Sequence, residues 1–355
     1  MEKNLAVLAG DGIGPEVTAE ALRVLDAIEE KFGHQFTRKE GLVGAAAIDA
    51  TGHPFPPETE RLCRNSEAIL FGAIGDPKYD NDPNAKVRPE QGLLQMRKTL
   101  GLFANVRPVK SYPLLHAISP LKNHIIDGVD FVVFRELTSG IYFGEPRGRS
   151  EDGSKAFDTM LYTRDEITRV AKMAFEAAQN RRKKLTLVDK ANVLASSRLW
   201  RETLRSMHAN YPDVNLDFMF VDNAAMKIIQ QPAYFDVVVT GNMFGDIITD
   251  AASVIPGSLG MLPSASIGST VGMFEPIHGS YPEAAGKGKA NPLAAILSLA
   301  MLLRYSFGAF EESNTIERAV NQVLAKAYVT EDLNQEEPRT TSEVGERVAH
   351  YVKAS

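Results

Sequence analysis

Two aspartates stand four residues apart shortly after an apolar run. Residues 235–240 (Phe-Asp-Val-Val-Val-Thr) predict a buried strand, and residues 241–250 continue Gly-Asn-Met-Phe-Gly-Asp-Ile-Ile-Thr-Asp. If a helix begins near Gly245, the carboxylates of Asp246 and Asp250 lie on one face and can share a hard cation such as Mg²⁺ or Mn²⁺. The alternative is that the pair only interacts with the helix dipole. Asp222, at the end of another predicted strand, offers a third oxygen ligand and favours the metal.

A second set of residues could bind a charged and branched ligand. In residues 89–99, one helical face would combine an anion, two aliphatic side chains and a cation: Glu90, Leu93, Leu94 and Arg97. Arg107 and Arg135 add two guanidinium groups, and arginine holds planar carboxylates through paired hydrogen bonds. Any one of these arginines alone is more typical of a surface ion pair. As a set they predict a site for a branched dicarboxylic acid.

Two side chains are candidates for proton transfer. Tyr142 follows Arg135 closely, and Lys190 stands at the exit of a strand predicted at residues 185–188. A phenol and an ammonium group can act as acid and base when burial or a metal moves the pKa of each toward neutrality. Without such surroundings, Tyr142 would be an aromatic residue on a sheet and Lys190 a solvated strand end.

Glycine-rich segments are candidates for phosphate binding. Residues 10–16 (Gly-Asp-Gly-Ile-Gly-Pro-Glu) follow an apolar strand and open a helix, but Pro15 stands where the last glycine of a Rossmann fingerprint should fall, so we predict no Rossmann fold. The backbone amides of residues 274–287 could hold a pyrophosphate. With Asn291 and Pro292 opening the next helix, this loop predicts an adenosine pocket, although His278 alone would be structural.

Composition limits the class of protein. The chain has 355 residues, of which 44% are hydrophobic and 24% charged, enough for two domains with their own cores. A formal charge of −6 disfavours nucleic-acid binding, which needs a dense basic face. Cys63 is the only cysteine, so no internal disulfide can form and we expect a cytoplasmic protein. No signal-peptide pattern and no apolar run of roughly 18 residues is present, so we expect no membrane partner.

Short apolar runs alternate with longer amphipathic segments, which is typical of an α/β protein. Strands are predicted at residues 5–9, 68–71, 131–134, 185–188, 217–221 and 235–240. Several end in polar residues, and ligands of open α/β sheets bind at the carboxyl ends of strands. Residues 72–89 and 257–268 are rich in Gly, Pro and Asn and predict binding loops, while the basic run 181–184 predicts a solvated helix end.

These segments resemble the isocitrate/isopropylmalate dehydrogenase family of metal-dependent β-decarboxylating dehydrogenases. The resemblance rests on residues 242–250 (Asn-x-Phe-Gly-Asp-Ile-x-Thr-Asp) with Gly-Ser-Leu-Gly at 257–260, and on residues 10–16, 135–144 and 278–280. It covers nearly the whole chain. It implies an α/β fold that is not a Rossmann fold, with one domain formed by residues 1–102 and 257–355, a second inserted domain formed by residues 103–256, and an active site in the cleft between them.

The resemblance also implies a reaction. NAD-dependent oxidation and decarboxylation would convert 3-isopropylmalate to 4-methyl-2-oxopentanoate and CO₂ in leucine biosynthesis, with Mg²⁺ or Mn²⁺ as the metal. Lys190 would accept the hydroxyl proton and Tyr142 would protonate the enol carbon. The chain would be an obligate homodimer in which Lys190 and Asp222 reach into the partner's site.

The resemblance implies three ligand sets, which share some members. The substrate set is Glu90, Leu93, Leu94, Arg97, Arg107, Arg135, Val193 and Asp222. The cofactor set is Ile13, Gly75, Glu90, Asn192, Glu275, His278, Gly279, Ser280, Glu283 and Asn291. The metal set is Asp222, Asp246 and Asp250.

Two departures and two alternatives bear on these expectations. Residues 281–283 read Tyr-Pro-Glu where the family commonly has Ala-Pro-Asp; Glu283 matches the acid that holds the ribose of NAD, so we expect NAD rather than NADP. Glu90 would repel the third carboxylate of isocitrate. A tartrate or D-malate dehydrogenase of the same family stays open as an alternative. A noncatalytic regulatory subunit is disfavoured because every acid, base and metal ligand is retained.

Overall fold

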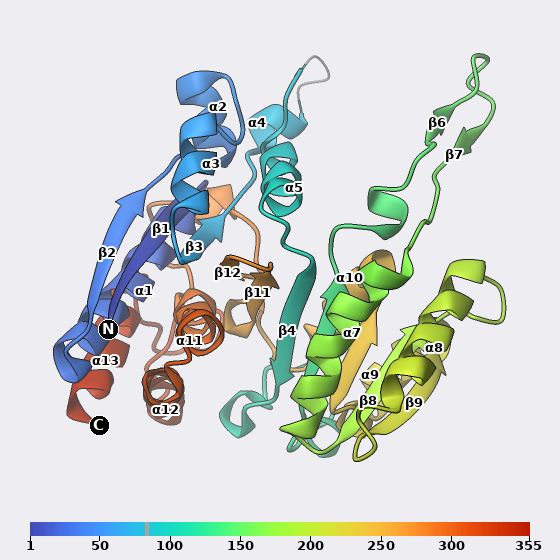
Figure 1. Cartoon of the computed structure of the whole chain (residues 1–355). Coiled ribbons are helices and arrows are strands. Elements are labelled where there is room, and N and C mark those ends of the chain that lie inside the picture. The colour runs from blue at the N-terminus through green and yellow to red at the C-terminus, as the bar shows by residue number, and fades with distance from the viewer. Residues whose placement is uncertain (82–84) are drawn as a thin grey trace. The chain divides into compact units, whose positions relative to one another are not determined.

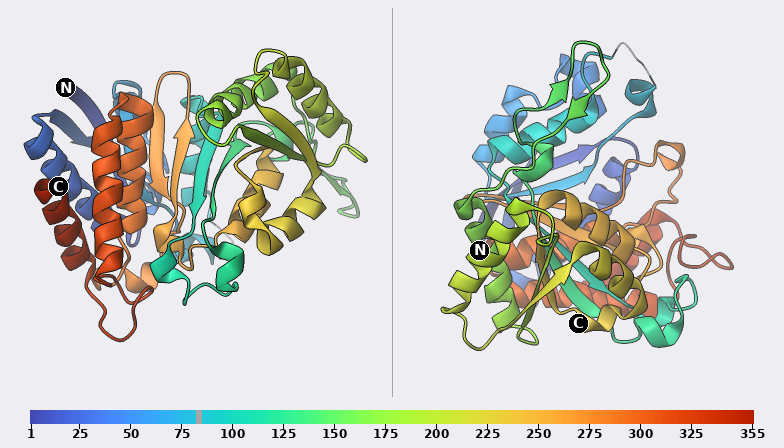
Figure 2. Two further views of the ribbon diagram at one scale, coloured as in Figure 1. Left: turned by 90° about the horizontal axis from the view of Figure 1, so that it is seen from below. Right: turned by 90° about the vertical axis from the view of Figure 1, so that its right-hand side faces the viewer.

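The computed structural model describes residues 1–81 and 85–355. The chain divides into two compact units, which are described separately. Unit 1 combines Met1–Leu102 with Gly257–Ser355, and unit 2 is Phe103–Pro256. Both chain ends therefore belong to unit 1 (Figure 2).

The described part of unit 1 contains five sheet strands in the order β2-β1-β3-β12-β11 (Figure 1). Their bounds are β1 Glu2–Gly10, β2 Gln35–Glu40, β3 Ala68–Ala73, β11 Pro263–Ile267 and β12 Gly272–Pro276. All neighbours run parallel except β11 and β12, which form an antiparallel pair. Ile69 and Phe71 of β3 are buried in an apolar core, as expected for a strand inside a covered parallel sheet.

Helices cover both faces of this sheet. The helix α1 spans Gly14–Phe32, with Pro15 in its first turn and Gly33 in the left-handed conformation at its end. It packs against α13 and α11. The remaining helices of unit 1 are α2 Gly44–Thr51, α3 Pro57–Arg64, α4 Pro77–Asp80, α5 Pro89–Thr99, α11 Leu293–Phe307, α12 Phe310–Ala325 and α13 Thr341–Ala354.

The described strands of the main sheet in unit 2 have the order β4-β5-β10-β8-β9. They are β4 Ala104–Lys110, β5 Asp130–Glu136, β8 Lys184–Asp189, β9 Asn215–Phe220 and β10 Val237–Thr240. The β4–β5 pair is antiparallel and the other pairs are parallel. The helices are α6 Asn123–Ile126, α7 Arg164–Gln179, α8 Ala195–His208, α9 Val221–Gln230 and α10 Asn242–Ala252. One apolar cluster joins α9 and α10 to the sheet, and it includes Ala224, Ile228, Ile248 and Ala252.

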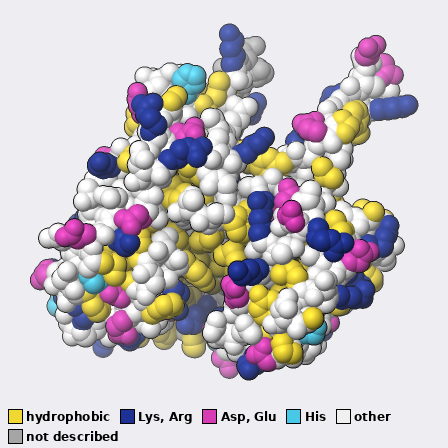
Figure 3. All heavy atoms as spheres, in the orientation of Figure 1, with side chains coloured by type: hydrophobic (Ala, Val, Ile, Leu, Met, Phe, Trp, Pro, Cys, Tyr) yellow, Lys and Arg dark blue, Asp and Glu magenta, His cyan; other side chains and the backbone are white. Residues whose placement is uncertain are grey.

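Unit 2 also carries a short antiparallel hairpin of β6 Gly148–Arg149 and β7 Ala156–Phe157. The hairpin extends away from the rest of its unit (Figure 1), and charged side chains of both signs surround its tip (Figure 3). Phe157 is half exposed. Among the helices of residues 1–81 and 85–355, none is long and apolar enough to cross a membrane.

The predicted α/β class is confirmed, and each predicted strand is present with small differences at its ends. The strand predicted to start at Phe235 begins at Val237, and the carboxylate of Asp236 just before it accepts hydrogen bonds from Arg181 Nε and the Arg182 backbone N–H. The strand predicted to end at Val221 stops at Phe220, so Asp222 lies in the first turn of α9.

Three other expectations were wrong in part. The helix expected near Gly245 begins at Asn242; Gly245 is needed instead for packing, because a Cβ there would come within 2.6 Å of Arg135 Cγ. The loops expected at residues 72–89 and 257–268 contain α4 and the strand β11, and residues 82–84 of the first lie outside the described residues. The basic run 181–184 follows α7 and is solvated only in part: Arg182 and Lys183 are exposed, whereas Arg181 pairs with Asp130 and Asp236, and Lys184 lies in β8.

Candidate active site

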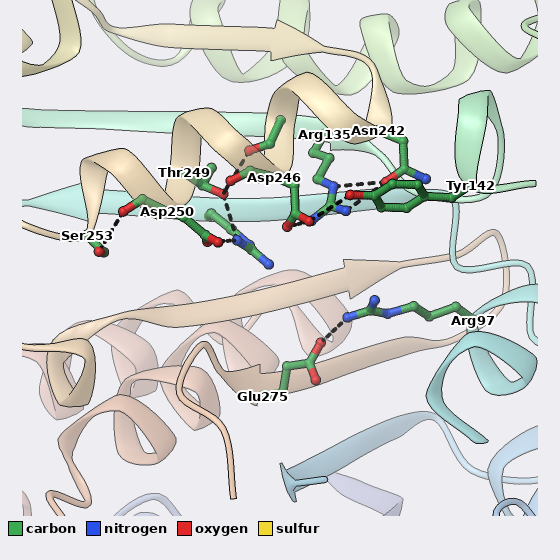
Figure 4. Close-up of polar contacts among 11 residues, drawn as sticks. Arg97, Arg135, Tyr142, Asn242, Asp246, Thr249, Asp250, Ser253 and Glu275 are labelled. Atoms are coloured by element: carbon green, nitrogen blue, oxygen red, sulfur yellow. Dashed lines mark hydrogen bonds and ion pairs between the residues drawn. The ribbon is translucent and has the colours of Figure 1, made fainter. Parts of the chain in front are cut away.

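The acidic pair of α10 faces two arginines of the neighbouring strands (Figure 4). Asp246 pairs with Nη1 of Arg135 on β5, and Asp250 Oδ1 lies 3.4 Å from Nη1 of Arg107 on β4. In the antiparallel register, Arg135 stands opposite Asn105, so Arg107 is two residues along the same face. Two strand residues span about 6.6 Å and four helix residues about 6 Å, so the spacing of the arginines matches that of the aspartates.

Asn242 holds Arg135 in this position. The Asn242 side chain is almost fully buried, and its Oδ1 accepts hydrogen bonds from Nη2 of Arg135 at 2.7 Å and from Nε at 3.1 Å. Its Nδ2 donates to the backbone oxygen of Ser139, and its backbone N–H donates to the Tyr162 hydroxyl. Asn242 is part of the sequence signature at residues 242–250, but the sequence alone predicts no role for it.

Thr249 holds the second arginine, Arg107, in position. Its Oγ1 accepts a hydrogen bond from Nη1 of Arg107 at 2.6 Å and donates one to the backbone oxygen of Gly245 one turn earlier. Thr249 was also not predicted. A signal was present, because a threonine one residue before Asp250 shares the helix side of Gly245, but nothing in the sequence tells which partner its hydroxyl meets.

Tyr142 joins this group from a short 3₁₀ turn, Gly140–Tyr142. Its hydroxyl donates a hydrogen bond to Asp246 Oδ2 at 3.0 Å, and its ring stacks near the Arg135 guanidinium (Figure 4). Burial and then the nearby Asp246 carboxylate raise the pKa of Tyr142 above its usual value. Both effects disfavour the phenolate, so Tyr142 carries its proton at neutral pH and can donate it.

Lys190 and Asp222 form a separate pair in unit 2. Lys190 directly follows β8, and its Nζ lies 2.8 Å from Asp222 Oδ1. The hydrogen bond from Lys190 lowers the pKa of the exposed Asp222 carboxyl. The strand end beside Lys190 is fixed by Asp189, which is buried and accepts two hydrogen bonds from Arg201. Asn192 and Val193 lie in the exposed turn that follows Lys190.

The three predicted metal ligands do not meet within one chain. Across residues 1–81 and 85–355, no cluster of three or more His, Cys, Asp or Glu side chains could hold a metal. Asp246 and Asp250 offer two carboxylates on α10, whereas Asp222 is occupied by Lys190. Two of the three predicted ligands therefore share α10, and the third pairs with Lys190 instead.

Unit 1 carries the predicted apolar and cofactor residues. On α5, Glu90 and Leu94 are exposed and Leu93 packs partly against the core. Arg97 is not a surface ion pair: its Nη2 donates to Glu275 Oε1 at 3.1 Å, and both side chains are largely buried (Figure 4). Glu275 lies near the carboxyl end of β12. The strand β12 therefore positions the acid, and the helix α5 positions the arginine.

The start of α1 brings together three of the predicted cofactor residues, namely Ile13, Gly75 and Ser280. The backbone N–H of Ile13 donates to the Ser280 oxygen at 2.7 Å. Gly12 must be glycine there, since a Cβ would come within 2.0 Å of that oxygen. A Cβ on Gly75 would lie 3.0 Å from Glu90 Oε1 and 3.5 Å from Ser280 Oγ, so these predicted cofactor residues share one small region.

The predicted adenosine loop lies in the same unit. Burial lowers the pKa of His278, and its buried Nε2 has no hydrogen-bond partner among the described residues. Gly279 has open space around it, and Glu283 is exposed in the 3₁₀ turn Pro282–Ala284. Asn291 precedes α11 and accepts a hydrogen bond from the N–H of Leu293, the first residue of that helix. Its Nδ2 donates to Asp332, a contact that could not be predicted because Asp332 lies 41 residues further along the chain.

Comparisons with known proteins agree with this fold. The model of the family "Isocitrate/isopropylmalate dehydrogenase" matches residues 4–348. The chain belongs to this family of α/β dehydrogenases. A 3-isopropylmalate dehydrogenase from Bacteroides fragilis is 55% identical over 355 residues, covering 99% of both chains. One from Aquifex aeolicus is 54% identical, covering 94% of this chain and 92% of its own. The crystal structure of isocitrate dehydrogenase from Methylococcus capsulatus superposes with a TM-score of 0.88 at 33% identity, covering 99% of each chain.

Proposed function

We propose that this chain is a 3-isopropylmalate dehydrogenase of leucine biosynthesis, which oxidises its substrate with NAD and releases CO₂ to give 4-methyl-2-oxopentanoate. The observation that carries the proposal is an identity of 55% over 99% of the chain with an enzyme of that name. The branched part of this substrate is an isopropyl group, and the two leucines of α5 offer an apolar surface for it. The lone buried thiol Cys63 agrees with a cytoplasmic location.

In this proposal, three arginines bind the two carboxylates of the substrate. Arg107 and Arg135 are each held by an acid of α10 and by a second polar side chain, and Arg97 is held by Glu275. Guanidinium groups that are already oriented lose little conformational freedom when they bind a carboxylate. Glu90, on the same helix as Leu93 and Leu94, places a negative charge where isocitrate would bring a third carboxylate.

The donor set of α10 fits a hard divalent cation. Carboxylate oxygens are the ligands that Mg²⁺ and Mn²⁺ prefer, and Asp246 and Asp250 present two of them on one helix face. We propose that Asp222 of a second copy completes the set. A bound divalent ion would lower the pKa of the substrate hydroxyl and later polarise the carbonyl that replaces it.

In this proposal, two side chains carry out the proton transfers. Lys190, on the strand end fixed by Asp189 and Arg201, accepts the proton of the substrate hydroxyl. Tyr142 holds its proton at neutral pH and delivers it to the enol carbon after CO₂ has left. The two groups therefore act at opposite ends of the reaction.

The unit 1 residues fit a dinucleotide. The family generally uses NAD and a divalent metal, and the buried Nε2 of His278 is a polar atom that still needs a partner. A bound NAD would supply the hydride acceptor that oxidation of the substrate needs. We propose that Ile13, Gly75, Ser280 and Asn291 hold it in place, and that exposed Glu283 accepts hydrogen bonds from the adenosine ribose.

A homodimer is part of the proposal. Met226 on α9 and Ile247 on α10 are each more than half exposed, and these helices also carry Asp222 and Asp246. Exposed apolar side chains on neighbouring helices are typical of an interface. The β6–β7 hairpin adds support, because a two-stranded ribbon is marginally stable by itself and its Phe157 is half exposed.

Substrate assays test the chemistry directly. We expect NADH formation from 3-isopropylmalate that needs Mg²⁺ or Mn²⁺ and is at least about tenfold more efficient in kcat/KM than with D-malate or tartrate, because a buried branched group contributes 1 to 3 kcal/mol. Equal efficiency with D-malate or tartrate would favour the alternative dehydrogenase. No turnover of any of these acids or of isocitrate, with metal present, would favour a regulatory subunit.

Subunit mixing tests the shared site. Lys190→Ala and Tyr142→Phe chains, each nearly inactive alone, are refolded together. If the two residues of one site come from different chains, half of the randomly formed dimers regain one of two sites, so about a quarter of wild-type activity returns. Each variant refolded alone is the control. No recovery in mixtures that do form heterodimers would place both residues in one chain's site.

A further inference from the structure

Asp11 is a buried carboxylate whose partners are backbone amides. It is 6% exposed, in the glycine-rich turn between β1 and α1. Its Oδ2 accepts hydrogen bonds from the backbone N–H groups of Ala45 and Gly75, and its Oδ1 accepts one from Ala46, each at 2.9 Å. No ion pair of Asp11 is found within the described part of the chain. Two of the three amides open helix α2, whose positive dipole end favours the negative charge.

The third amide links Asp11 to the proposed cofactor residues. Gly75 lies between β3 and α4, where no strand or helix hydrogen bond fixes its N–H. The Asp11 carboxylate fixes this N–H by accepting its hydrogen bond. On the other side of Gly75 lie the side chains of Glu90 and Ser280. Ile13, two residues after Asp11, donates its N–H to Ser280. The Asp11 turn therefore touches both segments that carry the cofactor residues.

Only a carboxylate can satisfy this set of donors. Asparagine has one acceptor oxygen, and its NH₂ group would face one of the amide N–H groups. Burial raises the pKa of Asp11, against the lowering effect of the amide bonds, so the charge is held at a cost in solvation. A carboxylate kept buried without a cation needs an explanation beyond filling space, because an apolar residue would fill it without that cost.

We propose that Asp11 is a positioning residue for dinucleotide binding: by anchoring the Gly75 amide and the start of α2 together, it fixes the backbone surface that Gly75 shares with Glu90 and Ser280. This inference rests on the proposed NAD-dependent function and adds a residue that does not itself touch the cofactor. Removing the anchor lets the chain at Gly75 relax toward the space that the dinucleotide would fill. Affinity for the dinucleotide then falls, while the arginine and acid groups of unit 2 keep their arrangement.

The test compares matched truncations of two buried acids. Asp11→Ala removes the anchor. Glu20→Ala removes another acid of unit 1 that is almost fully buried, but Glu20 contacts Arg23 and Gly345 rather than the cofactor residues. NADH affinity of each purified dimer is measured by fluorescence titration without substrate. We expect Asp11→Ala to weaken NADH binding roughly tenfold or more, and Asp11→Asn to fall between it and wild type because it keeps one acceptor oxygen.

The same variants separate positioning from general damage. With NAD saturating, KM for 3-isopropylmalate should change less than about threefold in Asp11→Ala, because the proposed carboxylate-binding residues Arg107 and Arg135 belong to unit 2. Glu20→Ala should lower the urea midpoint yet leave NADH affinity within about twofold of wild type. An unchanged NADH affinity in folded Asp11→Ala, or an equal loss in Glu20→Ala, would overturn the inference.

Hydrogen exchange on the wild-type protein covers the case in which Asp11→Ala does not fold. We expect slow exchange of the Gly75 amide, although it lies outside strands and helices, and exchange at the free-coil rate would overturn the anchor. A wild-type protein that binds no NADH and oxidises none of the acids would overturn the proposed function and the cofactor role together. In that case slow exchange at Gly75 would still report the Asp11 contact, so the two failures can be told apart.

Discussion

Replacing Asn242 by alanine tests how Arg135, the arginine proposed to bind a substrate carboxylate, is held. The substitution removes the oxygen that accepts two hydrogen bonds from Arg135, and it removes the donor to Ser139 O. Arg135 keeps its pairing with Asp246. The guanidinium is thereby left with a carboxylate at one end and without the amide oxygen that fixes its plane.

The expected loss follows from the bonds removed. A hydrogen bond to a charged group contributes about 1.5 to 3 kcal/mol and a neutral one about 1 kcal/mol. Because the two Arg135 bonds share one oxygen, we count them as less than two independent bonds and expect a loss of about 3 to 5 kcal/mol in the free energy of unfolding. A misoriented arginine should also raise KM for 3-isopropylmalate about tenfold to a hundredfold, which corresponds to about 1.4 to 2.8 kcal/mol.

Urea unfolding followed by circular dichroism gives the first quantity, and initial rates at saturating NAD give the second. Asn242→Asp is the matched control: it keeps an acceptor for Arg135 and loses the donor to Ser139 O, so its KM should stay within about threefold of wild type while stability falls. A KM for Asn242→Ala within twofold of wild type would refute the orienting role. An equal rise in Asn242→Asp would show that the effect is general damage.

Three further predictions concern the metal, the cofactor and the thiol. Asp246→Asn should lose most turnover while keeping its circular dichroism spectrum, and full activity of this variant in EDTA would contradict the metal assignment. Wild type should prefer NAD in kcat/KM, and Glu283→Lys should shift the ratio toward NADP because a cation replaces a group that repels a 2′-phosphate; a wild-type preference for NADP would contradict the role of Glu283. Burial raises the pKa of Cys63 to about 12, so at pH 8 roughly one thiol in 10⁴ is ionised and native protein should resist iodoacetamide until urea unfolds it.

Features that depend on local sequence could be predicted. Residues 68–71 are a continuous apolar run and residues 185–188 are apolar except for Thr186; such short runs are typical of a strand covered on both faces, and both stretches are fully buried. The first helix was predicted at both ends because Pro15 and Gly33 have conformational preferences that do not depend on tertiary contacts. The helical faces of Asp246 with Asp250 and of Glu90 with Arg97 follow in the same way from 3.6 residues per turn.

Contacts between distant segments could not be predicted. Asn242 and Tyr162 are 80 residues apart, and no periodicity connects a tyrosine hydroxyl to the first amide of α10. The partner of Arg97 could not be predicted, because Glu275 is 178 residues away. The contacts of Asp11 could not be predicted either, because its partners are backbone amides of distant segments. Two of the three amides belong to helix α2, and no side chain within that helix start caps it.

The two acids of α10 and the two arginines that pair with them form one group whose charges balance. Arg107 and Arg135 carry two positive charges, and Asp246 with Asp250 carries two negative charges, so the group is neutral when nothing is bound. A divalent cation alone would add two positive charges, and a dicarboxylate alone would bring two negative charges beside the two aspartates. Together the two additions cancel, with the aspartates turned to the cation and the arginines to the carboxylates. We therefore expect the metal and the dicarboxylate each to raise the other's affinity by the same factor, because coupling between two ligands is reciprocal.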